Sequence, residues 1–183
     1  SIGGAVAMNA GAYGHEIKDT LTWIEWVNPK GEIQKIPKDD LTMSYRDGNL
    51  PPGVIVTRAA FLCEPKDPGA IRTVLDDFLK EREKSQPIRG RTGGSTFKNP
   101  PYGEKAWQLI DRAGCRGLTI GDAQVSEKHC NFLLNLGHAT AADLETLGQT
   151  VQQQVYQKTG ILLKWEILRL GNPIDTLPLL RAT

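Results

Sequence analysis

What this sequence lacks already excludes several classes of protein. No apolar run approaches the roughly 18 residues that a membrane-spanning helix needs, and no signal peptide is recognisable, so we expect a cytoplasmic protein. The cysteines Cys63, Cys115 and Cys130 are odd in number and form no Cys-x-x-Cys, which argues against a disulfide framework and a structural zinc site. The net charge of +1 gives no reason to expect a nucleic-acid or anionic-membrane partner.

The common motifs of phosphate binding and acyl transfer are also missing. The chain has neither the Gly-x-x-x-x-Gly-Lys-Ser/Thr of a P-loop nor the Gly-x-Gly-x-x-Gly of a dinucleotide-binding turn. Because Gly-x-Ser-x-Gly is absent as well, a serine nucleophile is disfavoured. His15, His129 and His138 are scattered without metal-ligand spacing, and we expect no metal site.

Apolar periodicity and turn residues divide the chain into short strands and helices. Pro29 and Gly31 predict a hairpin turn at 28–31 between two strands. Strands are expected at 20–27, 32–36, 53–62, around 118–125 and 131–135, and at 161–170. Helices are expected at 68–84, 104–113 and 140–160, while 1–14 and 90–101 are expected to be glycine-rich loops.

The two longer helices carry apolar stripes and end signals. Pro68 suits the first turn of a helix whose apolar residues at 71, 74, 75, 78 and 79 we expect to pack onto a sheet. Thr140 with Asp143 predicts a capping box for the last helix, which ends at Gly160. Helices and strands alternate through the second half, which predicts an α+β fold with a boundary between the halves near 64–86.

Three polar residues stand in apolar or glycine-rich surroundings. Arg46 ends an apolar stretch, and its planar charged fork suits a carboxylate, although a surface pair with Asp47 is the plainer alternative. Ser95 follows glycines that expose its hydroxyl to a ligand, as a proton donor or a phosphate-binding group. Glu166 lies in an apolar stretch, where a carboxyl group tends to keep its proton and can act as a general acid; a surface pair with Lys164 is the alternative.

Basic residues gather in one part of an otherwise neutral chain. They are Arg82, Lys84, Arg89, Arg91 and Lys98. Their density suits a small phosphorylated ligand better than a nucleic-acid duplex, and a solvated loop is the alternative.

Several motifs follow one another through nearly the whole chain. They are the Ser-Ile-Gly-Gly-Ala-Val segment at 1–14, Tyr45-Arg46-Asp47, Arg82-x-x-x-Gln86-Pro87, Gly94-Ser95-Thr96-Phe97-Lys98-Asn99-Pro100, the Gly121–Phe132 stretch and Trp165-Glu166. Together they resemble the UDP-N-acetylenolpyruvoylglucosamine reductase (UDP-N-acetylmuramate dehydrogenase, MurB) family. The run from Gly94 to Pro100 is the most specific of them, and the short connection from Arg46 to Phe61 resembles the loopless subgroup.

The resemblance implies an FAD-dependent, NADPH-driven oxidoreductase of peptidoglycan precursor synthesis. Hydride would pass to the enolpyruvyl double bond of UDP-N-acetylglucosamine enolpyruvate, which gives UDP-N-acetylmuramate. Arg46 and Glu166 would stabilise the enolate-like intermediate, and Ser95 would deliver the proton that quenches it.

The resemblance also implies an arrangement of domains and binding residues. Residues 1–66 would be the C-terminal part of an FAD-binding domain of the vanillyl-alcohol-oxidase/PCMH type, 67–170 an α+β substrate-binding domain, and 171–183 a tail. The implied FAD contacts are Gly3, Gly4, Ala5, Asn9 and Gly11. The implied diphosphate and sugar contacts are Tyr13, Arg82, Lys98 and Asn99, with Gln124 near the nucleotide and Lys105, Lys128 and His129 without a defined role.

Two departures from the family pattern change these expectations. Leu168 stands where family members commonly have an arginine, and Arg169 follows one position later, so we expect an altered flavin contact. Family members also begin with another flavin-binding lobe, so we expect a fragment that binds FAD poorly without that lobe as a partner. The alternatives are a non-catalytic UDP-sugar-binding fragment and another FAD-linked oxidoreductase of the same superfamily.

Overall fold

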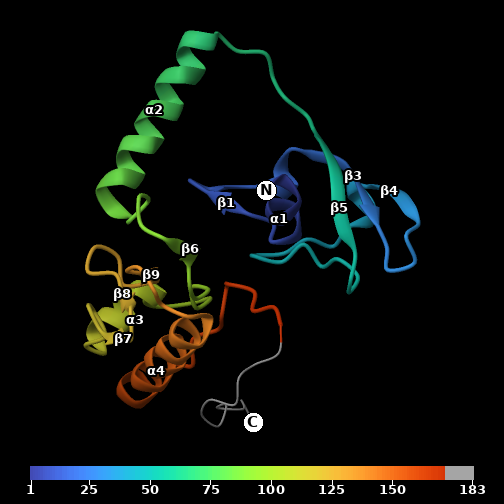
Figure 1. Ribbon diagram of the computed structural model, residues 1–183. Coiled ribbons are helices and arrows are strands. Elements are labelled where there is room, and N and C mark those ends of the chain that lie inside the picture. Colours follow the sequence, from blue (N-terminus) through green and yellow to red (C-terminus); the bar gives the residue numbers. More distant parts are fainter. Residues whose placement is uncertain (172–183) are drawn as a thin grey trace. The chain divides into compact units, whose positions relative to one another are not determined.

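The structure, a computed structural model, describes residues 1–171, and the chain forms two compact units (Figure 1). The N-terminal unit spans Ser1–Asp67, and the C-terminal unit begins at Pro68. Each unit has helices and antiparallel strands, which confirms the predicted α+β class. The predicted tail lies outside the described residues, apart from Gly171. Up to residue 171, no helix combines the length and the apolar character needed to cross a membrane.

A three-stranded antiparallel sheet is the centre of the N-terminal unit. Its strands are β3 (Leu21–Val27), β4 (Ile33–Pro37) and β5 (Ile55–Phe61), in the order β4-β3-β5, with short 3-10 helices at Ile17–Asp19 and Lys38–Asp40. The predicted hairpin is confirmed, because Val27 pairs with Ile33 across a turn in which Gly31 has a φ of 83°. The buried core of the unit consists of Val6, Leu21, Ile24 and Trp26.

Residues 1–14 do not form the loop that their glycine content predicts. Ile2–Ala7 is a helix, α1, which the Ser1 hydroxyl caps by accepting the Gly4 amide at 3.1 Å. A Cβ on Gly3 would lie 2.8 Å from the Val56 carbonyl oxygen, so this glycine lets α1 approach β5 closely. Capping and close packing outweigh the low helix propensity of the glycines. The strands β1 (Gly11–Ala12) and β2 (His15–Glu16) then form a small hairpin.

The C-terminal unit is built on a four-stranded antiparallel sheet. Its strands are β6 (Thr92–Ser95), β7 (Thr119–Ile120), β8 (Ala123–Val125) and β9 (Phe132–Asn135), in the order β6-β9-β8-β7. The helices α3 (Ala106–Arg112) and α4 (Ala141–Thr159) share one buried core with this sheet. Figure 1 shows both helices in the same part of the molecule as the four strands. The fully buried side chains of this core include Phe97, Leu109 and Leu147.

The two long helices differ in how much of their apolar stripe is buried. In α4 the predicted capping box is confirmed: the Thr140 hydroxyl accepts the Asp143 amide at 3.1 Å, and the Asp143 carboxylate accepts the Thr140 amide at 2.8 Å. Its Leu147, Val151 and Val155 are completely buried. The helix α2 (Pro68–Ser85) forms as predicted, but its stripe is 37–54% exposed, so the prediction that this stripe packs onto a sheet is wrong for the described residues. Periodicity shows which face is apolar, not whether another element covers it.

Two further segments differ from the sequence prediction. Residues 90–101 are not simply a loop, because β6 pairs with β9 through Thr92–Leu134 and Ser95–Phe132. Residues 161–170 do not form the predicted strand and join no sheet; a single antiparallel bridge links Trp165 to Phe97. Alternation of apolar residues predicts extended backbone, whereas the number of backbone partners depends on tertiary contacts.

Candidate active site

Ser95 ends β6 directly after a backbone conformation that glycine adopts most easily. Gly94 has a φ of 93°, and, its two chain neighbours aside, no atom of residues 1–171 lies within 4 Å of the position that a Cβ on it would take. The β6–β9 register shifts between Thr92 and Ser95, as expected for a bulge. The Ser95 side chain is half-buried, and within residues 1–171 its hydroxyl makes no hydrogen bond. This hydroxyl is therefore available to a ligand.

Glu166 lies across from the residue that follows Ser95. The Glu166 amide donates to the Thr96 carbonyl at 2.8 Å, and the Lys98 amide donates to the Lys164 carbonyl at 2.8 Å. Between these two bonds, the rings of Phe97 and Trp165 pack with their centroids 4.9 Å apart. Two segments that are distant in sequence thus bring Ser95 and the half-buried Glu166 into one neighbourhood.

The predicted substrate-binding residues of the C-terminal unit divide into two groups. Lys98 and Asn99 continue the segment of Ser95, and both are half-buried. The Asn99 Oδ1 accepts the Ala106 amide at 3.0 Å, so this side chain also caps α3. Gln124 lies on β8, which β9 separates from β6. The structure therefore places Lys98 and Asn99 near Ser95, and Gln124 further along the sheet.

The basic residues at the end of α2 make contacts of their own. The Arg82 Nε donates to the Gln86 Oε1 at 3.3 Å. The Arg89 guanidinium pairs with the Glu83 carboxylate at 3.1 Å. The Lys128 ammonium donates to the Glu83 carbonyl, so the 126–129 loop contacts the last turn of α2. These contacts place Arg82 and Lys128 in one basic region.

His129 packs among aromatic rings. Its ring centroid lies 4.8 Å from that of Phe132 and 6.2 Å from that of Trp107. Burial lowers the pKa of His129 below its ordinary value, which favours a neutral imidazole at neutral pH. Its Nδ1 accepts the Asn131 amide at 3.3 Å, so the proton of the neutral ring lies on Nε2. Lys105 is exposed and precedes α3 as its N-cap residue.

Arg46 lies in the N-terminal unit, in a tight turn. The Ser44 and Asp47 backbones exchange hydrogen bonds of 2.8 and 3.1 Å, and Arg46 between them has a φ of 54°. Such a conformation is uncommon for a residue other than glycine. The half-buried Arg46 donates from Nη2 to the Gly11 carbonyl at 2.8 Å, and its guanidinium lies 4.9 Å from the centre of the Tyr45 ring.

Asn9 connects this turn to the β1–β2 hairpin. It is fully buried, and its Nδ2 donates to the Ser44 carbonyl at 2.8 Å and to the Glu16 Oε2 at 3.1 Å. Its Oδ1 accepts the Lys18 amide at 3.1 Å. Tyr13, at the hairpin turn, has a φ of 54° and is 42% exposed. Asn9 therefore holds the segments of Arg46 and Tyr13 together.

The five residues expected to contact FAD differ in their contacts within the N-terminal unit, and their contacts with FAD stay a prediction. Gly3 packs against β5, Asn9 uses its amide within the unit, and a Cβ on Gly11 would lie 2.5 Å from the His15 carbonyl oxygen. Gly4 is exposed and Ala5 is half-buried, and neither carries more than a methyl group. These two residues fit the close approach of a flat cofactor, whereas the other three have structural reasons for their identity.

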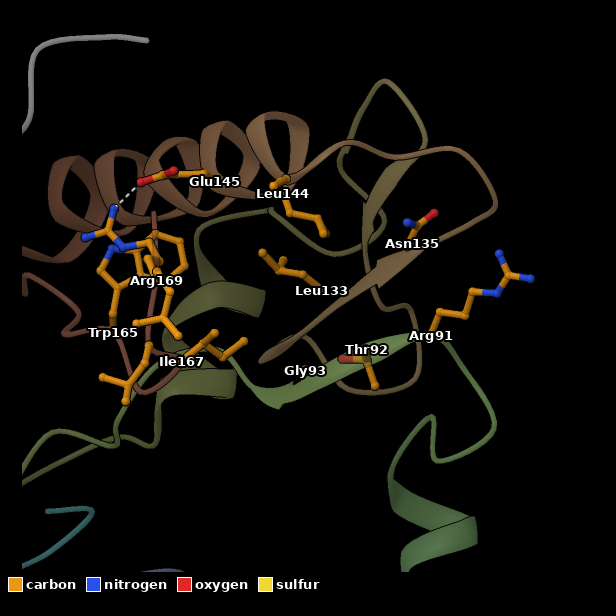
Figure 2. Close-up of a pocket in the computed structure, with 13 residues that line it drawn as sticks. Arg91, Thr92, Gly93, Leu133, Asn135, Leu144, Glu145, Trp165, Ile167 and Arg169 are labelled. Carbon is orange, nitrogen blue, oxygen red and sulfur yellow. Dashed lines mark hydrogen bonds and ion pairs between the residues drawn. The ribbon is translucent and has the colours of Figure 1, made fainter. Parts of the chain in front are cut away.

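A mostly apolar cavity of about 620 Å³ lies in the C-terminal unit (Figure 2). Leu133 and Trp165 line it, and neither Ser95 nor Glu166 does. Arg169 lies at this cavity, pairs with Glu145 of α4 and stacks 4.8 Å from the centre of the Trp165 ring. The Arg169 guanidinium therefore already has an ion-pair partner on α4. No motif in the sequence predicts this cavity.

Comparison with known proteins identifies the family of the chain. Residues 86–170 match the sequence model described as UDP-N-acetylenolpyruvoylglucosamine reductase, C-terminal domain. Two curated proteins named UDP-N-acetylenolpyruvoylglucosamine reductase, from Gluconobacter oxydans and Acidiphilium cryptum, are 57% identical over 93% and 94% of this chain. The chain belongs to the UDP-N-acetylenolpyruvoylglucosamine reductase family. It spans 56% of the length of each of these two reductases.

A solved reductase of this family has the same fold. The crystal structure of UDP-N-acetylenolpyruvylglucosamine reductase (MurB) from Thermus caldophilus superposes with a TM-score of 0.78 at 37% identity. The similarity covers 90% of this chain and 58% of that reductase. It confirms both the resemblance to the reductase family and the α+β class that the sequence predicts.

The predicted site residues are shared between the two units. Ser95, Glu166, Lys98 and Asn99 lie on adjoining segments of the C-terminal unit. Arg46, Tyr13 and the glycine-rich segment form one cluster in the N-terminal unit, and a cleft that unites both groups stays a prediction. The motifs also contain a residue to which the sequence assigned no role. Asn131 belongs to the Gly121–Phe132 stretch that resembles the family, and the structure shows that it is 4% exposed.

Proposed function

We propose that this chain supplies the substrate-binding and proton-donating part of a UDP-N-acetylenolpyruvoylglucosamine reductase. The main support is the half-buried Ser95 hydroxyl, which makes no hydrogen bond within residues 1–171 and lies next to the pairing of Thr96 with Glu166. A hydroxyl placed in this way, in a chain of this family, suits donation of a proton to a substrate carbon. The product would be UDP-N-acetylmuramate, a precursor of peptidoglycan.

The proposed chemistry needs charge stabilisation and one proton from this chain. When bound, FAD would supply the hydride for the enolpyruvyl double bond, with NADPH as its reductant. Negative charge would then develop on the carbon that bears the carboxylate, and Arg46 and Glu166 would stabilise it. Ser95 donates its proton to that carbon; because a serine hydroxyl is a weak acid, this requires a strongly basic carbon within hydrogen-bonding distance.

Binding of the substrate follows from the remaining polar residues. We infer that Lys98 and Asn99, next to Ser95, contact the sugar and the diphosphate, with Arg82 and Tyr13 as further contacts and Gln124 near the nucleotide. The exposed Gly4 and the adjacent Ala5 fit contact with FAD. A cytoplasmic location agrees with this proposal, because UDP-linked precursors and NADPH occur in the cytoplasm.

The proposal is tested by the colour of the purified protein and by its two half-reactions. Without oxygen, NADPH should bleach the yellow flavin, and UDP-N-acetylglucosamine enolpyruvate should restore the colour. Mass spectrometry should then detect a product with two more hydrogen atoms than the substrate. A flavin that NADPH bleaches but this substrate does not reoxidise would contradict the proposal.

The outcome also separates the other two functions. A colourless protein that UDP-N-acetylglucosamine derivatives protect from thermal unfolding would be a non-catalytic UDP-sugar-binding protein. If the protein responds neither to NADPH nor to the UDP-sugar, another FAD-linked activity of the same superfamily remains as the alternative.

A further inference from the structure

The segment of Ser95 changes its hydrogen-bonding partner within two residues. Ser95 still pairs with Phe132 of β9, whereas Phe97 pairs with Trp165 on the other side. At such a change the backbone groups that point toward β9 lose their regular strand partner. A buried backbone group without a partner is destabilising, so another group has to bond to it.

Asn131 supplies the bonds that β9 does not. The backbone carbonyl of Asn131 accepts the Thr96 backbone amide at 2.8 Å. Its side-chain Oδ1 accepts the Phe97 backbone amide at 3.0 Å, and its Nδ2 donates to the Phe97 backbone carbonyl at 2.8 Å. The side-chain amide thus forms a two-bond pair with the backbone of a single residue, as a neighbouring strand would. Asn131 is 4% and Phe97 is 1% exposed, so water has little access to replace these bonds.

These contacts lie between the two residues proposed to act on the substrate. Thr96 follows Ser95 directly, and its carbonyl accepts the Glu166 amide at 2.8 Å on the side away from Asn131. The position of Thr96 and Phe97 therefore sets the offset between the Ser95 hydroxyl and the Glu166 carboxyl group. Lys98 comes next along the same segment, and its backbone amide donates a hydrogen bond to the Lys164 carbonyl.

We propose that Asn131 is a positioning residue that fixes Ser95 relative to Glu166. This inference rests on the proposed reductase function. Asn131 itself does not touch the substrate; it acts through the backbone of Thr96 and Phe97. A displacement of about 1 Å of a reacting group can lower a rate by about 100-fold, so a loosened segment affects proton delivery to the substrate more than any step that does not involve Ser95.

The test compares two Asn131 variants in the flavin-loaded protein. In Asn131→Ala both side-chain bonds are lost, and in Asn131→Asp the acceptor for the Phe97 amide remains while the donor to the Phe97 carbonyl is lost. We expect reoxidation of the reduced flavin by UDP-N-acetylglucosamine enolpyruvate to slow by about 100-fold, with bleaching by NADPH unchanged. We also expect faster amide hydrogen exchange at Phe97, which reports the segment independently of turnover.

Asn135, the last residue of β9, offers a matched control for Asn131, which directly precedes that strand. Its Oδ1 accepts the Gly137 and Ala139 amides at 2.9 and 3.1 Å, and its Nδ2 donates to the Ala139 carbonyl at 2.9 Å. Asn135→Ala therefore removes a comparable set of side-chain-to-backbone bonds away from Ser95. Both half-reactions of this variant should keep the rates of the unsubstituted protein.

The results separate this inference from the proposed function. If the unsubstituted protein does not reduce the substrate, the reductase function fails and the inference fails with it. If it does, and the folded Asn131 variants keep its reoxidation rate, the positioning role alone is refuted. Equal slowing by Asn135→Ala would refute it too. Failure of both Asn131 variants to fold would show that the residue serves stability alone.

Discussion

In the N-terminal unit, Arg46 and Tyr13 have φ values of 54° without being glycine; in the C-terminal unit, Gly94 has the φ of 93° that precedes Ser95. A left-handed backbone costs about 1–2 kcal/mol at a residue with a Cβ and very little at glycine. The first cluster therefore contains backbone strain, which the buried bonds of Asn9 offset. The second avoids that strain and depends on the backbone bonds of Asn131.

This difference in backbone strain indicates whether substitutions in each cluster should change reaction rates, stability or both. Strained non-glycine residues concentrate at functional sites when surrounding contacts hold them, so Arg46 and Tyr13 support a functional role for the N-terminal cluster. Around Ser95 the backbone is relaxed and the hydroxyl keeps an open hydrogen-bonding capacity within residues 1–171. We therefore expect substitutions near Ser95 to change reaction rates most, and substitutions near Arg46 to change both rates and stability.

Ser95→Ala should have the largest effect. Removal of the proposed proton donor should slow substrate reduction by about 100- to 10,000-fold, while NADPH still bleaches the flavin at an unchanged rate. Stopped-flow absorbance measures the two half-reactions separately. Equal slowing of both would refute the proton-donor role and, with it, the contrast between the two clusters.

Arg46→Lys should have the second-largest effect on the rate of substrate reduction. Lysine keeps the positive charge but lacks the planar guanidinium, so charge stabilisation on the substrate should weaken and the rate of substrate reduction should fall by about 100- to 1,000-fold. Arg58→Lys on β5 is the control, because the exposed Arg58 forms a surface ion pair with Glu25, at 3.5 Å, and is not among the predicted site residues. Equal rates in the two variants would remove Arg46 from the site.

Asn9→Ala should lower the free energy of unfolding by about 1–3 kcal/mol, because it leaves the Ser44 carbonyl and the Lys18 amide without their buried partner. Asn28→Ala is the control: Asn28 also makes three hydrogen bonds, with Lys30 and Glu32, but at an exposed turn where water replaces them. Urea denaturation measures both variants. A similar loss in both would show that burial of Asn9 is not what holds the strained turn.

Gly94→Ala should isolate backbone strain in the other cluster. Apart from its chain neighbours, no atom in the described part of the chain lies within 4 Å of the added Cβ, so the loss of about 1–2 kcal/mol in unfolding free energy would come from the left-handed φ. Gly137→Ala is the control, because its Cβ would make an ordinary contact of 3.6 Å with Asp122 and its φ is not left-handed. Equal stability of the two variants would contradict the contrast drawn for Gly94.

The smallest expected effect is a difference in thiol reactivity between the cysteine of the N-terminal unit and the two of the C-terminal unit. Cys63, in the N-terminal unit, is exposed, whereas burial raises the pKa of both Cys115 and Cys130 to about 11. A thiol reagent at neutral pH should modify Cys63 in the native protein and all three cysteines only after unfolding. Because the buried thiols keep their protons longer in the folded state, their contribution to stability should fall as the pH rises from about 9 to about 11. Rapid modification of Cys115 would contradict this.

Much of the fold follows from local sequence signals. The β3–β4 hairpin is predicted by Pro29 and Gly31, and α4 by Thr140, Asp143 and Gly160, because a turn or a cap is a contact between neighbouring residues. The helix at 2–7 and the single bridge at Trp165 could not be predicted in this way. Each depends on a partner from another part of the chain, β5 in the first case and Phe97 in the second.

Residue identity and spacing are enough to predict the family, the positions of the chemically suitable residues and the apolar faces of the helices. They do not predict that the stripe of α4 is buried while that of α2 is exposed, or that Asn131 and Asn9 hold the segments of Ser95 and Arg46. The physical reason is that burial and long-range hydrogen bonds require two partners, and spacing along the chain describes only one of them.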